Sequence, residues 1–223
     1  MAEQKRGRRF AKYVPDYVVF DLETTGISVI RDDIIEISAV KVRGGKVVDS
    51  FSTLVNPGRR IPYGATAVNG ITDDMVADAP CIEQALNGFL TFAGNHILVG
   101  HNIHSFDMKF VYDAAVGLWN LSVDNDYIDT LYMSRSCLPQ LPHHRLVDIA
   151  AYFDISTEGA HRALNDCMMN QKCFEALGKI QQTLEVRVCP KCGGELQRRK
   201  GRFGEFFGCC NYPVCRYTRN IKA

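Results

Sequence analysis

Residues 17–26 read YVVFDLETTG, and this stretch decides the fold. Its first four residues are apolar and β-prone, which is typical of a buried strand. Asp21 and Glu23 follow, and the two-residue period of a strand points both carboxylates to one face. Like charges so close repel each other unless a cation lies between them, and hard oxygen ligands favour Mg²⁺ or Mn²⁺. A solvated strand end is the alternative for this pair alone.

Two later segments add carboxylates beside predicted strand or helix ends. Residues 96–100 (HILVG) predict a short buried strand before a helix that carries Asp107 in its first two turns. Asp107 alone would be explained as a helix N-terminal charge. The segment HRALNDC places His161 at the start of a long predicted helix and Asp166 about one turn inside it. A single histidine before a helix is more often structural, so the case depends on the whole set.

Together, Asp21, Glu23, Asp107, His161 and Asp166 resemble the DEDDh class of 3′→5′ exonucleases, the superfamily of the proofreading subunit of bacterial DNA polymerase III. The resemblance implies a ribonuclease-H-like α/β fold, a mixed sheet flanked by helices. It also implies phosphodiester hydrolysis with two Mg²⁺ or Mn²⁺ ions, releasing nucleoside 5′-monophosphates. Asp21 would bridge the ions, Glu23 and Asp166 would hold the ion carrying the attacking water, and Asp107 would serve the other. His161 would be the general base.

The same resemblance implies a set of substrate contacts: Thr24, Thr25, Gly26, Ile71 and Asn102. The first three follow the strand, where backbone amides could meet the terminal nucleotide. Ile71 would be a base wedge or a core residue, and core is the more common fate of an isoleucine. Asn102 is either a substrate contact or a cap or turn residue.

The C-terminal segment contains two pairs of cysteines, Cys189 with Cys192 and Cys209 with Cys215. Such spacing predicts a structural zinc site, and nothing suggests secretion or a disulfide. Residues 188–219 resemble the four-cysteine zinc ribbons at the C-termini of type IA DNA topoisomerases. That resemblance implies one structural Zn²⁺ on these four thiols, with Cys210 as the alternative to Cys209. So small a segment needs the metal in order to fold.

The near-neutral net charge hides a polarised chain. Residues 184–223 carry nine Lys and Arg against three acids, a net charge of +6, whereas residues 1–183 have a net charge of −5. Five aromatic residues are interspersed among the basic ones: Phe203, Phe206, Phe207, Tyr212 and Tyr217. Aromatic rings beside cations suit single-stranded nucleic acid, although some of these rings must form the core of the ribbon itself.

The chain is therefore divided into a basic N-terminal arm (residues 1–15), expected to be frayed, an exonuclease domain (16–183) and a nucleic-acid-binding zinc ribbon (184–223). Beyond the first strand, alternation predicts strands over 33–43 and 47–55, joined by a hairpin, and short strands over 97–99 and 127–128. Helices are predicted over 81–93, 105–117, 130–137, 145–153 and 163–183, with Asp129 as a cap.

Three functions fit these observations. The first is a DNA 3′→5′ exonuclease in repair or proofreading, which would need a polymerase or another replication or repair protein as partner. The second is an exoribonuclease that trims RNA 3′ ends, and the topoisomerase-like ribbon favours DNA over RNA. The third is a non-catalytic nucleic-acid-binding module or polymerase adaptor, which the full set of five residues disfavours. No apolar run approaches the ~18 residues of a membrane span, and nine cysteines indicate a reducing, cytoplasmic compartment.

Overall fold

A computed structural model describes residues 6–158, 162–184, 187–202 and 204–221. Its centre is a five-stranded mixed sheet of order β3-β2-β1-β4-β5. The first three strands are antiparallel neighbours: β1 (Tyr17–Thr24), β2 (Ile34–Arg43) and β3 (Lys46–Leu54). The last two run parallel to β1: β4 (Leu98–Gly100) and β5 (Tyr127–Asp129). The expected mixed sheet and its hairpin are confirmed.

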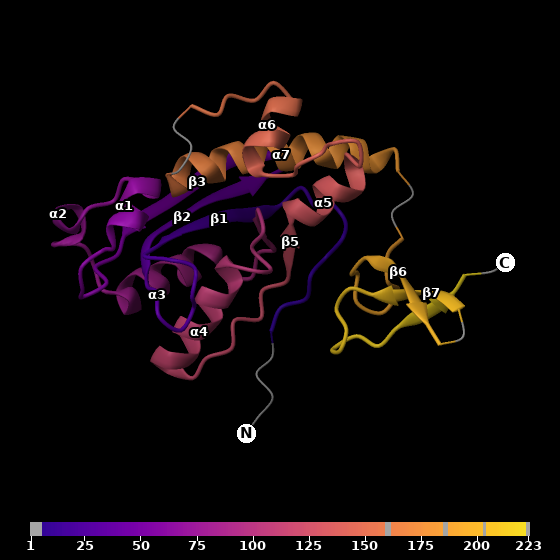
Figure 1. The fold of residues 1–223 in the computed structure, drawn as a ribbon, viewed down its shortest axis with the longest axis horizontal. Helices are drawn as coiled ribbons and strands as arrows, with labels where there is room; N and C mark the ends of the chain where they lie inside the picture. Colours follow the sequence, from indigo (N-terminus) through magenta and orange to yellow (C-terminus); the bar gives the residue numbers. More distant parts are fainter. Residues whose placement is uncertain (1–5, 159–161, 185–186, 203, 222–223) are drawn as a thin grey trace.

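Helices cover both faces of this sheet (Figure 1). One layer consists of α3 (Ile82–Ala93) and α4 (Asp107–Trp119). The other consists of α5 (Thr130–Cys137), α6 (Leu146–Tyr152) and α7 (Ala163–Gln182). Two short helices, which the sequence patterns did not predict, connect β3 to α3: α1 (Tyr63–Asn69) and α2 (Asp73–Val76). No helix in the described part of the chain is long and apolar enough to cross a membrane.

The strand β1 supplies side chains to both layers. Val18 and Phe20 pack in the cluster formed with α3 and α4, whereas Tyr17 and Val19 pack in the cluster formed with α5, α6 and α7. Full burial of each such side chain contributes about 1.5–3 kcal/mol. Asp21 and Glu23 continue the alternation of Tyr17 and Val19, so they point to the layer that contains α7.

The C-terminal ribbon is a separate three-stranded antiparallel sheet of order β6-β7-β8. Its strands are β6 (Leu196–Gly201), β7 (Gly204–Cys209) and β8 (Thr218–Asn220). Its small core contains Leu196, Phe207 and the four paired cysteines. Two large apolar side chains are too few to stabilise a domain, so a bound metal would have to contribute.

The N-terminal arm is not frayed over residues 8–13, contrary to expectation. Arg9 forms a parallel bridge with Tyr127 at the outer edge of β5. The amide of Phe10 donates to the carbonyl of Tyr127 over 2.7 Å, and the amide of Tyr127 donates to the carbonyl of Arg8 over 3.0 Å. We call residues 8–13 the strap. It extends the sheet by one short edge segment that the sequence pattern did not show.

Candidate active site and zinc centre

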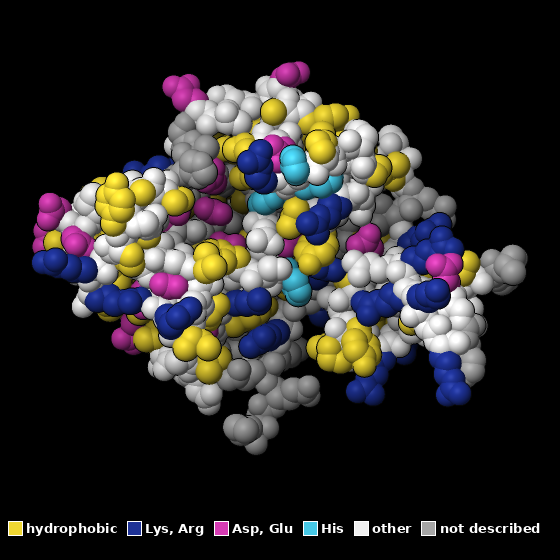
Figure 2. Space-filling model, in the orientation of Figure 1, with side chains coloured by type: hydrophobic (Ala, Val, Ile, Leu, Met, Phe, Trp, Pro, Cys, Tyr) yellow, Lys and Arg dark blue, Asp and Glu magenta, His cyan; other side chains and the backbone are white. Residues whose placement is uncertain are grey.

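Three of the predicted carboxylates meet at the end of β1. Asp21 and Glu23 lie on β1, and Asp166 lies in the first turn of α7. One oxygen from each lies within 4.8 Å of the others. The side-chain alternation of β1 explains this meeting, because both β1 carboxylates face the layer to which α7 belongs. Figure 2, drawn in the orientation of Figure 1, shows acidic side chains in a hollow of the surface below α7. Histidine side chains lie beside this hollow.

Asp107 reaches the site from the opposite layer. It is the first residue of α4, only 3% exposed, and its Oδ1 accepts a hydrogen bond from the amide of Leu22 over 3.2 Å. Leu22 lies between Asp21 and Glu23, so this bond fixes the start of α4 against the acidic end of β1. Asp107 therefore adjoins the group of three without belonging to it.

The carboxylates are electrostatically unfavourable in the absence of a cation. Burial, and then the neighbouring carboxylates beginning with Asp107, raise the pKa of Asp21 well above its usual range. Burial followed by nearby acids raises the pKa of Glu23 to about 7. Burial also raises the pKa of Asp107 to about 7, although the hydrogen bond from Leu22 opposes it. A cation would reverse these shifts, and an all-oxygen donor set fits Mg²⁺ or Mn²⁺.

Glu36 and Arg162 support the site, although no sequence pattern predicted a role for them. Glu36 lies on β2 directly opposite Glu23 and is 3% exposed. Its carboxylate accepts hydrogen bonds from Nη2 of Arg162 over 3.2 Å and from the amide of Ala163 over 3.4 Å. These contacts tie the start of α7 to the sheet and so place Asp166. The available signal was a lone acid inside an apolar strand, where a buried charge needs a partner.

His161 lies outside the described residues, so its assignment as general base remains a prediction. The chain resumes at Arg162, which precedes α7 and is tied to Glu36.

Two of the predicted substrate contacts, Thr24 and Thr25, make hydrogen bonds within the loop that follows β1. Oγ1 of Thr24 donates to the carbonyl of Gly26 over 2.6 Å, and the amide of Thr25 donates to the carbonyl of Asp33 over 2.9 Å. Both threonines are buried, and they hold the loop after β1. A Cβ at Gly26 would lie 2.6 Å from the carboxylate of Asp32, which explains the need for glycine there. The substrate contacts of Thr24, Thr25 and Gly26 remain predictions.

Ile71 is a core residue, which is the second of the two alternatives that the sequence left open for it. Its side chain is fully buried in a cluster with Ile35, Ile61 and Val76. The neighbouring Asn69 is the polar residue of this segment that affects the site. Its Oδ1 accepts the amide of Ile71 over 3.1 Å, and a hydrogen bond from its side chain lowers the pKa of Glu23 against the larger effect of burial.

Asn102 lies in a loop between β4 and α4 with a left-handed backbone, φ 63°. Its amide donates to Oδ1 of Asp129 over 3.0 Å. Asp129 also caps α5, as predicted, by accepting the amide of Leu131. Asn102 borders an open pocket of about 540 Å³, which is lined further by His101, Leu131, Arg135, Pro142, His143, His144, Arg145 and Leu146.

The four predicted zinc ligands converge in the ribbon. Their sulfurs all lie within 4.8 Å of one another, with Cys189 and Cys215 3.7 Å apart and Cys192 and Cys209 3.3 Å apart. A disulfide would require about 2.05 Å. Tetrahedral zinc with Zn–S bonds of about 2.3 Å places sulfurs roughly 3.8 Å apart, so the donor set fits Zn²⁺. Cys210 is outside the group and faces Gly194, where a Cβ would lie 2.9 Å from its sulfur.

Comparison with known proteins accounts for both centres. A family model described as an exonuclease matches residues 18–174. The chain belongs to the exonuclease family. A second model, the topoisomerase DNA binding C4 zinc finger, matches residues 186–223 of this exonuclease. The two family resemblances found in the sequence are thereby confirmed.

Curated relatives of the exonuclease include polymerases of much greater length. It is 41% identical over 194 residues to a DNA polymerase III PolC-type from Caldanaerobacter subterraneus subsp. tengcongensis, covering 87% of this chain and 14% of the relative. It is 43% identical over 179 residues to a DNA polymerase III PolC-type from Oceanobacillus iheyensis, covering 80% of this chain and 12% of the relative. The exonuclease thus spans 14% and 12% of the length of these two relatives.

Solved structures confirm the fold of the exonuclease. Exonuclease X, in complex with 5′ overhanging duplex DNA, matches with a TM-score of 0.58 and 28% identity over 75% of this chain and 92% of the other. Exonuclease I of E. coli, in complex with a dT13 oligonucleotide, matches with a TM-score of 0.69 over 91% of this chain and 54% of the other. At 17% identity, the second match supports the fold alone.

Proposed function

We propose that the protein is a 3′→5′ exonuclease that removes nucleoside 5′-monophosphates from single-stranded DNA. The observation that carries the proposal is the meeting of Asp21, Glu23 and Asp166, with Asp107 beside them, in a chain of the exonuclease family. Half-buried acids whose pKa is raised by desolvation and by one another form a binding site for divalent cations, and here they occur at the carboxyl end of the central strand.

Each residue has a distinct role in this proposal. Asp21, Glu23 and Asp166 hold the cations, and Asp107 completes the ligand set from the start of α4. When bound, two Mg²⁺ or Mn²⁺ ions would neutralise the phosphodiester and increase the acidity of a bound water. His161 takes the proton from that water, for which an ordinary histidine pKa near ~6.5 is suitable. Glu36, through Arg162 and the amide of Ala163, keeps the start of α7 and so Asp166 in place.

Two pockets on the surface suggest the path of the single-stranded DNA. The pocket next to Asn102 offers imidazole and guanidinium groups, including His143, His144 and Arg135, to the phosphates that precede the 3′ end. A second pocket on the ribbon is lined by rings and cations: Arg199, Phe206, Tyr212, Arg216 and Tyr217. Rings beside arginines suit the stacking of unpaired bases, so the ribbon would hold the strand farther upstream.

DNA is favoured over RNA as substrate because the similar proteins act in that context. The two longer relatives described above are DNA polymerases, and Exonuclease X was solved with DNA. The family of the ribbon is described as DNA binding. On the same grounds, a DNA polymerase or another replication or repair protein is the proposed partner chain.

The deciding experiment compares single-stranded DNA and RNA of one sequence, each labelled at its 5′ end, with excess Mg²⁺. We expect a ladder of DNA products that shorten from the unlabelled end, release of nucleoside 5′-monophosphates, and slower loss of RNA. Asp21→Asn serves as the inactive control, and Asp78→Asn, at an exposed position far from the carboxylates in sequence, as the active one.

Two outcomes contradict the proposal. Early release of the 5′ label would show the wrong polarity. Faster degradation of RNA than of DNA would favour the exoribonuclease alternative.

A further inference from the structure

The strap joins the zinc ribbon to the exonuclease domain. On the ribbon side, the side-chain amide of Asn211 satisfies both backbone groups of Arg9: Oδ1 accepts the amide of Arg9 over 3.0 Å, and Nδ2 donates to its carbonyl over 3.0 Å. The amide of Ala11 donates to the carbonyl of Gly193 over 3.2 Å. The strap therefore pairs with the ribbon on one side while it pairs with β5 on the other.

Asn211 is in turn bound to the zinc ligands. Its Nδ2 donates to the sulfur of Cys192 over 3.4 Å, and its backbone amide donates to the sulfur of Cys209 over 3.4 Å. An NH₂ group has two protons, and here one goes to Arg9 and the other to a thiolate ligand. The position of Asn211 thus depends on the arrangement of the four cysteines. Its two hydrogen bonds to the backbone of Arg9 depend on that arrangement too.

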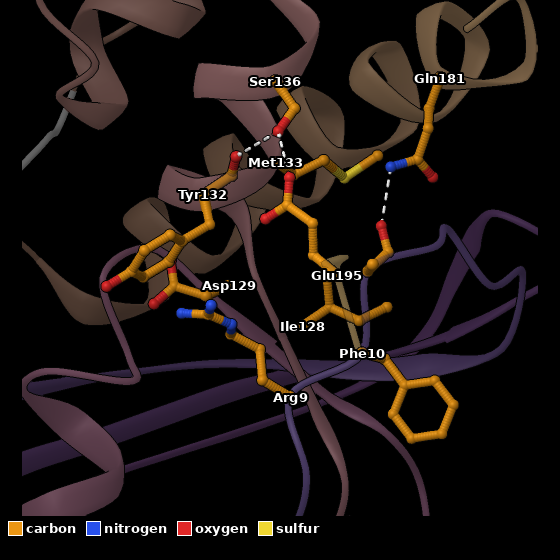
Figure 3. A pocket seen from close by; sticks show the side chains of 10 residues that line it. Arg9, Phe10, Ile128, Asp129, Tyr132, Met133, Ser136, Gln181 and Glu195 are labelled. Carbon is orange, nitrogen blue, oxygen red and sulfur yellow. Dashed lines mark hydrogen bonds between the residues drawn. The ribbon is translucent and has the colours of Figure 1, made fainter. Parts of the chain in front are cut away.

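On the exonuclease side, Arg9 is a buried cation aimed at the active-site loop. It is 6% exposed, and its guanidinium carbon lies 3.8 Å from the centroid of the Tyr132 ring. Figure 3 shows its side chain extending from the strap toward Tyr132 and Asp129. Burial raises the pKa of Asp129, while its backbone hydrogen bonds and the charge of Arg9 lower it.

Asp129 holds the loop that carries Asn102 and leads to Asp107. Its carboxylate accepts the amides of Asn102 and His104, each over 3.0 Å, and it is only 2% exposed. His104 also bonds the hydroxyl of Tyr127, the residue with which the strap pairs. The charge of Arg9 lowers the pKa of Asp129 against the larger effect of burial and so favours the ionised carboxylate, which accepts both amides more strongly.

The seam between strap, α5 and ribbon is packed. The cavity there has a volume of about 20 Å³, enough for roughly one water. Glu195 of the ribbon accepts a hydrogen bond from Ser136 of α5 over 3.1 Å (Figure 3). A Cβ at Gly194 would lie 2.5 Å from Nδ2 of Asn211 and 3.1 Å from the carbonyl oxygen of Arg9. Glycine is required at that position because the strap approaches so closely.

We propose that Arg9 is a positioning residue for the active-site loop 101–106, and that the zinc-bound ribbon holds Arg9 in place through Asn211. The zinc centre would then help to position the active-site loop. This role would be additional to any contact that the ribbon makes with the nucleic acid. The assignment of Asn102 and Asp107 to the active site rests on the proposed function, whereas the mechanical link between the zinc centre and the loop does not.

Hydrogen exchange of the full-length protein tests the link without any substrate. Amide exchange in residues 101–106 is measured with zinc bound, and again after chelation and return to Mg²⁺ buffer. We expect zinc removal to speed exchange in residues 101–106 of the wild type. Arg9→Ala should speed it to a similar degree with zinc bound, and zinc removal from this variant should add little there.

Arg8→Ala is the matched control. Arg8 is the adjacent arginine of the strap, but its side chain pairs with Asp126 at the exposed edge. The Arg8→Ala substitution should leave amide exchange in residues 101–106 unchanged. Arg9→Lys retains a cation, so its exchange rate in residues 101–106 should lie between those of wild type and Arg9→Ala. Gly194→Ala keeps the Arg9 side chain but displaces the carbonyl of Arg9 and the side chain of Asn211. It should speed exchange in the loop as Arg9→Ala does, and it provides an independent test if Arg9→Ala folds poorly.

Turnover provides the second measurement. For a short single-stranded DNA, Arg9→Ala should lower kcat by roughly 10- to 100-fold, the usual cost of a displaced catalytic group, with a smaller change in KM. If zinc removal changes exchange only in the ribbon and strap, or Arg9→Ala behaves like Arg8→Ala, the inference is wrong. Coupled exchange in a protein without nuclease activity would instead reject the proposed function and retain the link.

Discussion

At the scale of single residues, the candidate site consists of acids that repel one another. Asp21, Glu23 and Asp166 lie together, and the folded chain raises the pKa of the first two through burial and through their neighbours. Such a site lowers stability until a cation binds, so a variant without one of the charges should be more stable when no metal is present.

Glu23→Gln tests this effect as a function of pH. The pKa of Glu23 is raised from its ordinary 4.5 to about 7 by burial and then by nearby acids. A raised folded pKa means that the ionised acid costs stability, and the cost increases as the pH rises from 4.5 through about 7. The metal-free variant should therefore have a higher Tm than wild type at pH 8 and an equal one at pH 4. Excess Mg²⁺ should raise the Tm of wild type more. An equal Tm at both pH values would contradict this electrostatic account.

His161→Ala tests the proposed general base. It should slow hydrolysis by roughly 10²- to 10⁴-fold, while the affinity for a single-stranded oligonucleotide changes much less. Single-turnover kinetics beside equilibrium binding separates the two effects. A collapse in affinity with an unchanged chemical step would identify His161 as a binding residue.

At the scale of elements, the position of α7 depends on an ion pair between the buried Glu36 and the half-exposed Arg162, which directly precedes the helix. Glu36 on β2 holds Arg162 and the amide of Ala163. Glu36→Gln should loosen residues 162–167, seen as faster amide exchange, and lower kcat roughly tenfold. Because the two residues form one pair, Arg162→Gln should have a similar effect and the double variant little more. Additive losses would mean that the pair does not act as a unit.

The ribbon as an element depends on its zinc. Cys215→Ser should release the metal and unfold the chain beyond about residue 188, because the remaining core is too small. Cys210→Ser is the control, since that thiol lies outside the ligand group, and it should retain one zinc per chain. Zinc analysis with circular dichroism would show both effects. Loss of zinc from the Cys210 variant would overturn the ligand assignment.

At the scale of the whole molecule, the ribbon carries positive charge while the rest of the chain carries negative charge. Lys200→Ala with Arg216→Ala removes two exposed cations of the ribbon and leaves the zinc ligands and the strap unchanged. If both contact phosphates, the slope of log affinity against log salt for a long single strand should flatten by about 1.4, since each contact contributes roughly 0.7. An unchanged slope would mean that this face does not bind nucleic acid.

The sequence by itself determined the local elements and the chemistry. Strand alternation, helix patterns and cysteine spacing predicted most of the elements and a zinc site at the two cysteine pairs, because these signals depend on residues near one another in the chain. The full set of acids and the four zinc ligands followed from the resemblance to known families. The short helices α1 and α2 lacked such a signal. The N-cap residues that precede them, Pro62 and Thr72, make no side-chain hydrogen bond to the first turn.

Only the tertiary structure decided which side chains face the site. Ile71 and Asn69 are two residues apart, yet packing against Ile35 buries the first and brings the second to Glu23. Glu36 and Arg162 are 126 residues apart, and the strap contacts Asn211 across 202 residues. Contacts at such separations form because packed layers bring distant segments together, and no local periodicity reports them. The sequence therefore specified the groups that perform the chemistry, and the tertiary packing specified the groups that hold them in place.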